Sequence, residues 1–571
     1  MKNSVKLLLT SVASCAFLVA CGGGGGGSSS TPVAVAPPPA PPPPAPAPEP
    51  MTPVSSAPAV PDFVANEYPA SGTLRSLCQT VRTDTDLNGF PRGDEQGELL
   101  HELFWLRSFM NETYLFFDQV SDRDPNDFTN IAAYFDDRLT TASTATGRLV
   151  DRFSFIQPTE SFEATRSGAP TFGYGARYAT IQTNVLPRDW RIAFTQEGSN
   201  AETSGFTRGA QILTIDGADF LNGTTQADID AFNAGLFPTA IGEDHVFGVR
   251  MPDGTVTDIT VTSQAITIEP VNSVDILQNG DESVGYIHYQ TFGPFTGQAQ
   301  LFDAFTELSD AGVDDLVLDF RYNGGGLLDI AAQIGFMTAG PVTNGQTFEL
   351  MEFNSRSPNV NPFTGQPVTP IPFHNTTLLF NQNQSIASGL PLPSLDLPRV
   401  FVLTTEQSCS ASEAVMNGLM GIGIEVIQIG TRTCGKPTGQ FPVENCGTTY
   451  VPLHFRGVNA MGFGDYDDGF APAQSTSGAM IRGCEVEDDF SAILGTPEEA
   501  MLSAALTFAS TGSCPATAIA SRDVNGPLSS KSIGSSIPDP LMDDPRIKAY
   551  FGNMNRRISL SDLKKPAETN E

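Results

Sequence analysis

An apolar run, a cluster of hydroxyl side chains and a segment with apolar residues at helical spacing follow one another directly in Val400-Phe-Val-Leu-Thr-Thr-Glu-Gln-Ser-Cys-Ser-Ala-Ser-Glu-Ala-Val-Met-Asn-Gly-Leu-Met420. The run from Val400 to Leu403 predicts a buried strand, and Glu413 to Met420 predicts a helix. Ser410 and Glu413 match a capping box, so we expect the helix to begin at the serine. The N–H groups of a helix N-terminus have no intrahelical partners and can stabilise an oxyanion. The stretch therefore predicts a strand, turn and helix that present a nucleophile.

Strands and helices alternate on both sides of this stretch, from about residue 275 to residue 510. The predicted elements are Val284 to Tyr289, Gly297 to Ala311, Asp315 to Phe320, Pro398 to Thr404, Glu413 to Met420 and Glu425 to Gly430. Alternation of this kind is typical of an α/β core.

A glycine block, Asp319-Phe-Arg-Tyr-Asn-Gly-Gly-Gly326, directly follows one predicted strand. Glycines at this point allow the backbone to approach a ligand and turn its N–H groups toward it. No Lys-Ser or Lys-Thr pair follows, so the block is not a phosphate-binding loop. We expect it to supply a second oxyanion donor beside Ser410.

The glycine block, the Ser410 to Glu413 segment and Gly435-Lys436 with Gln440 resemble the signature blocks of the C-terminal processing (tail-specific) serine peptidases. They occur in that family's order. The resemblance implies a crotonase-like or Clp-like α/β catalytic core, with Ser410 as nucleophile, Lys436 as general base and Gln440 orienting the lysine. It further implies an oxyanion hole made by the N–H of Ala411 and that of Gly325 or Gly326, and it is compatible with a homo-oligomer.

Serine-lysine chemistry needs a neutral lysine. The reference pKa of a lysine is about 10.4, so activity near neutral pH requires a downward shift of about 3 units, or roughly 4 kcal/mol. We expect the apolar residues Val400 to Leu403, Met416, Ile427 and Ile429 to provide the burial. Ser408 and Ser412 are alternative hydroxyls to which we assign supporting roles. A free Cys409 is an alternative nucleophile, although no histidine lies near it in sequence.

Two further modules precede the catalytic core. Residues 93–165 contain Glu98 to Met110 and Asn130 to Leu139, both with apolar residues at helical spacing, and predict a small helical module. Residues 170–268 alternate short apolar and polar runs with turn signals and predict a β-rich domain.

Within the β-rich segment, Glu197 to Glu202 followed by Gly209 to Gly217 resembles the core of PDZ domains. Those domains add a peptide to a sheet edge and hold its terminal carboxylate on backbone N–H groups. By this resemblance the carboxylate loop is Phe172, Gly173, Tyr174 and Gly175. An ordinary β-hairpin with glycine turns is the alternative.

The N-terminus predicts export. Residues 1–20 carry two lysines and then an apolar stretch, as secretory signals do. Leu18-Val-Ala-Cys21 resembles a bacterial lipobox, which implies lipidation of Cys21. Gly22 favours the outer membrane of a Gram-negative bacterium, and a plain secretory signal is the alternative. Residues 21–75, rich in Gly, Ser, Pro and Ala, predict a tether, and residues 511–571 a polar tail.

Composition excludes several classes of function. The chain has 64 acidic and 31 basic residues, a balance that argues against nucleic-acid partners. Its five histidines show no metal-ligand spacing, so we expect no metal or other cofactor. Six cysteines remain after export, and we expect disulfides. Six cysteines allow 15 pairings; we expect sequence neighbours to pair, Cys434 with Cys446 and Cys484 with Cys514, which leaves Cys78 with Cys409.

The sequence thus favours a lipid-anchored serine endopeptidase that recognises protein substrates by their C-terminal tails. The alternative is a non-catalytic scaffold that binds tails through the PDZ-like module. The peptidase should turn over its substrate and lose that turnover on Ser410→Ala, whereas the scaffold should bind tails in both forms and show no turnover in either.

Overall fold

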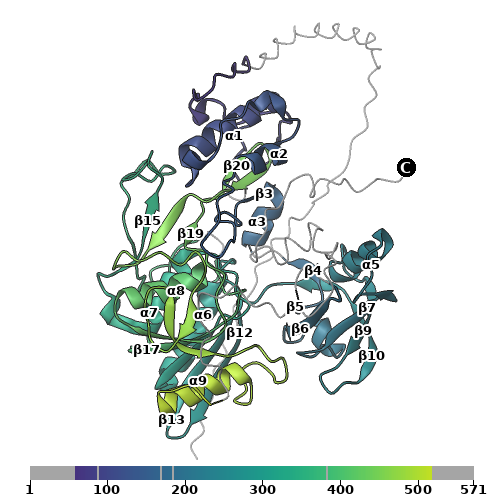
Figure 1. Cartoon of the computed structure of the whole chain (residues 1–571), viewed down its shortest axis with the longest axis vertical. Coiled ribbons are helices and arrows are strands. Elements are labelled where there is room, and N and C mark those ends of the chain that lie inside the picture. Colours follow the sequence, from purple (N-terminus) through teal and green to yellow (C-terminus); the bar gives the residue numbers. More distant parts are fainter. Residues whose placement is uncertain (1–57, 87–88, 168–169, 183–185, 381–383, 517–571) are drawn as a thin grey trace, which may run out of the picture. The chain divides into compact units, whose positions relative to one another are not determined.

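The computed structural model describes residues 58–516 apart from 87–88, 168–169, 183–185 and 381–383 (Figure 1). The expected signal segment, the lipidation site Cys21 and nearly all of the expected C-terminal tail lie outside the described residues. In the part of the chain described, no helix is both long and apolar enough to cross a bilayer.

A seven-stranded sheet forms the centre of the expected α/β core, in the order β12-β13-β14-β17-β18-β24-β23. Its strands are β12 (Val271–Asn279), β13 (Glu282–Tyr289), β14 (Asp315–Asp319), β17 (Arg399–Thr404), β18 (Glu425–Gly430), β24 (Met480–Glu485) and β23 (Ala471–Ala473). All neighbouring pairs are parallel except β12 with β13.

Helices cover both faces of this sheet, which explains why its strands are continuous apolar runs. On one face lie α6 (Gly297–Ala311), α7 (Leu328–Ala339) and α8 (Ala411–Gly421), grouped together in Figure 1; the other carries α9 (Ala500–Thr511). Because side chains alternate along a strand, Val400 and Val402 of β17 pack in the cluster with α6, α7 and α8, and Phe401 and Leu403 pack with α9.

The loops after β14 and β17 meet at one edge of the sheet, because these strands are parallel neighbours. The N–H of Cys409 donates to the carbonyl of Asn323 at 3.0 Å, and the Ser412 hydroxyl donates to the same oxygen at 3.1 Å. The two contacts hold the glycine block against the first turn of α8. The fold therefore brings together two of the three sequence blocks.

A smaller antiparallel sheet, ordered β16-β15-β22-β19, presents the third block. Its strands are β15 (Thr347–Phe353), β16 (Ile371–Pro372), β19 (Thr438–Gly439) and β22 (Phe455–Val458). Lys436 and Gln440 lie on either side of β19. The N–H of Gly457 in β22 donates to the Pro437 carbonyl at 2.8 Å, which ties the segment after the lysine to this sheet.

The expected helical module contains α1 (Leu99–Thr113) and α2 (Ile131–Asp137), close to the predicted bounds. It is not a separate unit, because β3 (Phe155–Pro158) pairs with β21 (Thr448–Val451) of the catalytic segment, and β21 pairs in turn with β20 (Val443–Asn445). The rings of Trp105 and Tyr450 also meet at 4.8 Å.

The predicted end of the tether, residue 75, is wrong. Residues 58–75 fold against α1, where the Arg107 guanidinium donates to the carbonyls of Val64 and Glu67 at 3.0 and 2.8 Å. Gly, Ser, Pro and Ala dominate only up to about residue 61, and the aromatic residues beyond that point give this segment something to bury. Short strands β1 (Leu77–Cys78) and β2 (Glu95–Gln96) follow.

Residues 170–268 form the expected β-rich domain, with a sheet in the order β10-β9-β7-β6-β5 and β8 paired to β7. Its elements are β5 (Ala176–Gln182), β6 (Asp189–Thr195), β7 (Gln211–Ile215), β8 (Ala218–Asp219), β9 (Asp244–Arg250), β10 (Val256–Thr262), α4 (Asn200–Thr203) and α5 (Gln226–Leu236). Just outside this sheet β4 (Thr171–Gly173) pairs with β11 (Gln264–Ile266), and α3 (Thr159–Ser167) precedes β4. Asp216 and Gly217 both have positive φ, as expected for the Asp-Gly turn.

Candidate active site

Ser410 lies at the N-cap of α8 with φ 57° and ψ −111°, a backbone conformation that non-glycine residues rarely adopt. A strained residue of this kind costs roughly 1–3 kcal/mol and persists only where its surroundings hold it. Gly325 packs directly against it: a Cβ added there would lie 2.7 Å from the Ser410 Cβ and 2.9 Å from the Ala411 nitrogen. The glycine at position 325 is therefore required for this approach.

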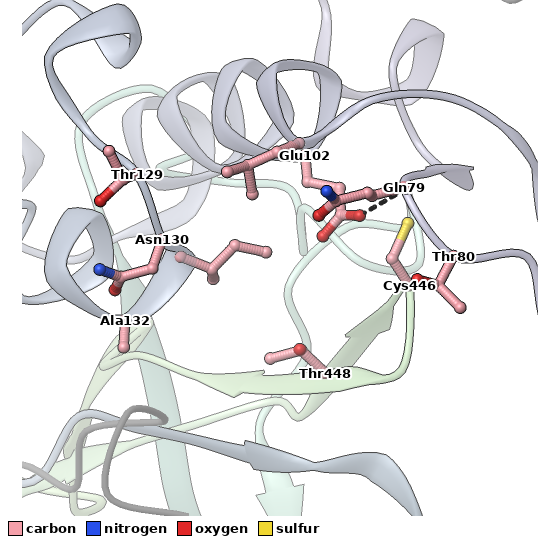
Figure 2. Close-up of a pocket in the computed structure, with 10 residues that line it drawn as sticks. Gln79, Thr80, Glu102, Thr129, Asn130, Ala132, Cys446 and Thr448 are labelled. Atoms are coloured by element: carbon pink, nitrogen blue, oxygen red, sulfur yellow. Dashed lines mark hydrogen bonds between the residues drawn. The ribbon is translucent and has the colours of Figure 1, made fainter. Parts of the chain in front are cut away.

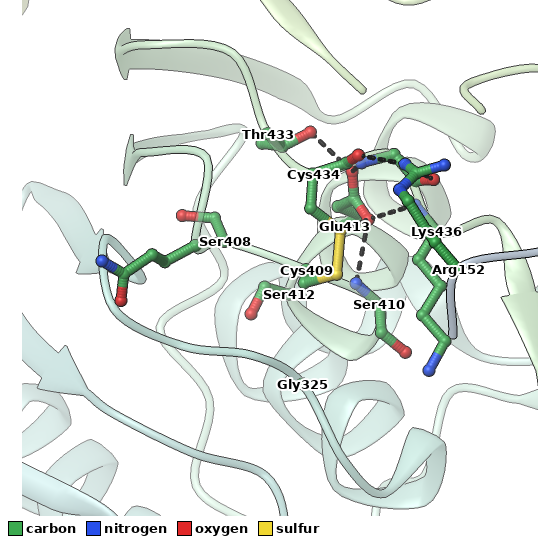
Figure 3. The surroundings of a disulfide bond; sticks show 12 residues. Arg152, Gly325, Ser408, Cys409, Ser410, Ser412, Glu413, Thr433, Cys434 and Lys436 are labelled. Atoms are coloured by element: carbon green, nitrogen blue, oxygen red, sulfur yellow. Dashed lines mark hydrogen bonds between the residues drawn. A yellow bond between two sulfur atoms is a disulfide. The ribbon is translucent and has the colours of Figure 1, made fainter. Parts of the chain in front are cut away.

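The neighbouring hydroxyls have structural partners. Ser408 donates to the Phe320 carbonyl at 2.8 Å and Ser412 to the Asn323 carbonyl at 3.1 Å, and both residues are fully buried. Ser410 is only partly buried. In Figure 3 the Ser410 hydroxyl and the ammonium end of Lys436 both extend away from the disulfide, into the same part of the view.

Gln440 is fixed so that its carbonyl faces the lysine. Lys436 Nζ donates to Gln440 Oε1 at 2.8 Å, while Gln440 Nε2 donates to the carbonyls of Phe153 and Val451 at 2.9 and 3.2 Å. An amide nitrogen has two hydrogens, and both are used here, so the oxygen must point to Lys436. The structure thus brings together two of the residues predicted from the third block.

Burial lowers the pKa of Lys436 to about 8. Part of this residue reaches the surface, and its ammonium group lies 5.2 Å from the centre of the Phe153 ring. The direction of the shift is the one that serine-lysine chemistry requires. Its expected source is wrong, because Val400 to Leu403, Met416, Ile427 and Ile429 pack inside the central core. Nothing in the sequence near Lys436 indicated that Phe153 would contact it.

Glu413 connects the serine to the lysine loop. Its Oε2 accepts the N–H groups of Ser410 and Lys436 at 2.9 Å each, and its Oε1 accepts the N–H of Gly435 at 2.8 Å and the Thr433 hydroxyl at 2.5 Å (Figure 3). Sharing one oxygen at 2.9 Å places the two amide nitrogens within about 6 Å of each other. Burial raises the Glu413 pKa, and the four hydrogen bonds oppose that rise. The capping box was predicted, and the link to the lysine was not.

A disulfide joins Cys409 to Cys434, beside both the serine and the lysine (Figure 3). The expected pairs Cys78 with Cys409 and Cys434 with Cys446 are wrong, because the structure pairs Cys78 with Cys446. Proximity in sequence misled here, since the fold brings together cysteines separated by 368 positions. Cys484 pairs with Cys514 as expected. A bonded Cys409 sulfur cannot act as the alternative nucleophile.

Gly325 and Gly326, the two predicted oxyanion donors, differ in whether their backbone N–H groups are already hydrogen-bonded. The N–H of Gly325 donates to Asn323 Oδ1 at 2.9 Å, so it is already engaged. Gly326 is exposed, with φ 143°, and Ala411 is the first residue of α8, where backbone N–H groups have no intrahelical partner. Gly326 and Ala411 therefore form the better candidate pair.

The predicted carboxylate-loop residues lie in the β-rich domain, directly before β5. Phe172 is half exposed, and Gly173 ends β4. The buried Tyr174 donates its hydroxyl to the Gly235 carbonyl at 2.8 Å. Gly175 has φ 82°, and a Cβ on it would lie 2.3 Å from that of Ser199, so only glycine fits there.

A cavity of about 260 Å³ lies elsewhere, between α1, the start of α2 and the Cys78–Cys446 disulfide (Figure 2). Its lining includes Gln79, Glu102, Asn130 and Thr448, and none of the predicted catalytic residues. It is therefore distinct from the candidate active site.

Comparisons with known proteins relate the chain to peptidases. Residues 283–454 match the model of peptidase family S41, a family of serine-type peptidases. The chain is 27% identical over 333 residues to a carboxyl-terminal-processing protease of Picosynechococcus sp., covering 55% of this chain and 68% of that protein. It is 33% identical over 192 residues to the chloroplastic C-terminal processing peptidase of Tetradesmus obliquus, covering 32% and 40%.

A solved structure shares the fold. The putative S41 protease from Bacteroides fragilis superposes with a TM-score of 0.53 at 24% identity, covering 72% of this chain and 97% of that one. Fold and matched blocks together define a serine-type peptidase with an α/β core. Residues 283–454 are therefore of the peptidase family S41 type, and the chain is similar to C-terminal processing proteases.

Proposed function

We propose that the protein is a lipid-anchored serine endopeptidase that cleaves proteins recognised through their C-terminal tails. The observation that carries the proposal is the partly buried contact of 2.8 Å between Lys436 Nζ and Gln440 Oε1, in a loop tied through Glu413 to the backbone of Ser410. A lysine held in this way, with a pKa of about 8, is neutral often enough near pH 7 to act as a base.

The mechanism follows from these positions. Neutral Lys436 takes the proton of the Ser410 hydroxyl as its oxygen attacks the scissile carbonyl. The oxyanion is stabilised by the N–H groups of Ala411 and Gly326. The lysine then gives its proton to the leaving amine, and water, activated by the same lysine, releases the acyl group from Ser410. Gln440 keeps the ammonium group in place through both steps.

The β-rich domain supplies the tail-binding site of this proposal. Strand β5 lies at the edge of its sheet, where an extended peptide can add as a further strand. The loop from Phe172 to Gly175 leads directly into that strand and would receive the terminal carboxylate on its backbone N–H groups. A substrate peptide ending in a carboxamide should therefore be cleaved more slowly than the same peptide with a free carboxylate.

Location is the remaining part of the proposal. The lipobox-like Leu18 to Cys21 supports lipidation of Cys21 and an outer-membrane position in a Gram-negative cell. Metabolic labelling with an alkyne-bearing palmitate analogue tests this. Label and membrane association should both be lost on Cys21→Ser, and a labelled Cys21→Ser protein would refute it.

The catalytic proposal is tested with the mature chain, a fluorophosphonate probe and an unfolded protein substrate. We expect wild type to be labelled and to cleave, Ser410→Ala to do neither, and Lys436→Ala to lose cleavage and most labelling. Ser412→Ala is the matched control, because that hydroxyl contacts only the Asn323 carbonyl, and it should remain active. Tail binding without cleavage by wild type would instead identify a scaffold.

A further inference from the structure

The carboxylate of Asp488 meets the start of the glycine block from a part of the chain beyond β24, outside the family-matched residues 283–454. Arg321 Nη1 donates to Asp488 Oδ1 at 3.1 Å, and the Tyr322 hydroxyl donates to Asp488 Oδ2. Arg321 and Tyr322 are buried, and the Asp488 side chain is 9% exposed. Two consecutive residues of the block are therefore held at a single carboxylate.

The β-rich domain holds the same carboxylate through Arg208. The Arg208 guanidinium forms an ion pair with Asp488, and its Nη1 donates to the Tyr322 hydroxyl at 2.7 Å. The adjoining Gly209 has φ 84°, and a Cβ there would lie 2.3 Å from the Phe490 carbonyl oxygen, so only glycine allows this approach. The domain thus contacts both the glycine block and the segment that carries Asp488.

Tyr322 lies next to the residues that shape the candidate oxyanion hole. The side chain of the following Asn323 donates to the Tyr289 carbonyl at 2.8 Å and accepts the N–H of Gly325 at 2.9 Å. Gly325 is followed by Gly326, whose N–H is a candidate oxyanion donor. The Asn323 carbonyl holds the nucleophile loop through the two contacts described above. A displacement of Tyr322 would therefore pass through Asn323 to the two glycines.

We propose that Tyr322 and Asp488 are positioning residues of the oxyanion hole: the bond between them fixes the start of the glycine block, so that the block presents the Gly326 N–H to the oxyanion. The proposal rests on the proposed peptidase function and deepens it. It gives the segment after β24 a part in stabilising the transition state, and Arg208 contributes by holding Asp488 in place.

Of the two contacts that the block makes with Asp488, that of Tyr322 is the one to remove. Arg321 also donates to both carboxylate oxygens of Glu499, at 2.9 Å each, and so keeps a partner if Asp488 is lost. A tyrosine hydroxyl has one hydrogen, and that of Tyr322 goes to Asp488. Tyr322→Phe removes this bond and leaves the ion pairs of Asp488 with Arg321 and Arg208 in place.

The test separates kcat from KM for the mature enzyme on an unfolded protein substrate at pH 9, where Lys436 is mostly neutral. Loss of a direct oxyanion donor costs about 10²–10³ in kcat. A displaced donor should cost less, so Tyr322→Phe should lower kcat about tenfold with KM within about twofold of wild type. The pH midpoint of kcat/KM should stay at that of wild type, because the hydroxyl does not contact the lysine.

A second readout is the affinity for a peptide aldehyde that ends at a cleavage site mapped in the same substrate. Its adduct with Ser410 carries the oxyanion and so resembles the transition state. The affinity of Tyr322→Phe for this aldehyde should fall by about the same factor as its kcat/KM. Binding of the corresponding peptide acid, which forms no such adduct, should change less than twofold.

Tyr286→Phe is the matched control. The Tyr286 hydroxyl is buried and also donates to a carboxylate, that of Asp319, at 2.7 Å. Asp319 is the last residue of β14 and is held by the strand ladder on both sides. The two variants should therefore lose similar thermal stability, while Tyr286→Phe keeps the wild-type kcat and aldehyde affinity.

A Tyr322→Phe enzyme with the wild-type kcat and aldehyde affinity overturns the proposal, even if it is less stable. A raised KM at unchanged kcat, or a shifted pH midpoint, also overturns it, because the effect would then lie in substrate binding or in the base. If Tyr322→Phe does not fold, Asp488→Ala removes the same bond from its other end, and a wild-type kcat there overturns the proposal. Absence of Ser410 labelling in wild type would instead refute the proposed function.

Discussion

Replacing Gln440 by glutamate puts a carboxylate next to Lys436, the proposed base, and should nearly abolish activity. The new carboxylate would lie where Oε1 now accepts from Lys436 Nζ at 2.8 Å. Opposite charges 4 Å apart attract by about 4 kcal/mol at an effective dielectric constant of about 20, which corresponds to about 3 pKa units. The Lys436 pKa would then rise from about 8 to about 11. At pH 8 the neutral fraction falls from about half to about one in a thousand, so activity should fall about 500-fold.

The assay is kcat/KM against pH from 6 to 11 on an unfolded protein substrate, with the rate of fluorophosphonate labelling as a second readout. Gln440→Glu also removes the donors to the Phe153 and Val451 carbonyls, so thermal stability should fall as well. Gln428→Glu is the control: it alters a buried amide whose Nε2 donates to other carbonyls, and should lower stability without moving the pH midpoint. A Gln440→Glu enzyme with the wild-type midpoint would refute the assignment of Lys436 as base.

Three further outcomes are expected. Wild-type kcat/KM should rise about fivefold between pH 7 and pH 8, because Lys436 becomes neutral above its lowered pKa of about 8; a profile flat across this range contradicts a lysine base. Replacing Cys409 and Cys434 together by serine opens a loop with a separation of 25 residues and should cost about 3.5 kcal/mol of unfolding free energy in urea, and an unchanged midpoint would count against the bond. Gly325→Ala should abolish labelling of Ser410, since the new Cβ would lie 2.7 Å from its Cβ, whereas labelling at the wild-type rate would show that the contact can relax.

Local chemistry made much of the catalytic core predictable. The helix over Gly297–Ala311 and the strand over Glu425–Gly430 were predicted with the bounds observed, because the helix has apolar residues at helical spacing, the strand is a short apolar run, and a glycine marks the end of each. The helix α7 was not predicted. It begins at Leu328, shortly after three glycines, which disfavour a helix and so made the start of the helical pattern hard to recognise.

The site residues also differ in how predictable their contacts were, depending on how far apart the partners lie in the sequence. Ser410 and Glu413 form a capping box, which spans a few residues and was therefore predictable. The partners of the third block come from far along the chain, since Gln440 donates to the carbonyl of Phe153, and Lys436 lies under the ring of the same residue. No pattern in one sequence joins positions almost 300 apart, and the same limit explains the wrong pairing of Cys78.

The residues around Lys436 therefore decide a property that the motif alone does not, namely the protonation state of the lysine. A serine, a lysine and a glutamine with the right spacing specify which atoms can react, but not whether the lysine is neutral, because that depends on what encloses it. Here Phe153, whose ring centre lies 5.2 Å from the lysine nitrogen, precedes β3 and is outside the family-matched range, and the Cys409–Cys434 bond joins the serine and lysine loops. The burial that lowers the Lys436 pKa therefore depends on residues outside the family-matched range as well as on the motif.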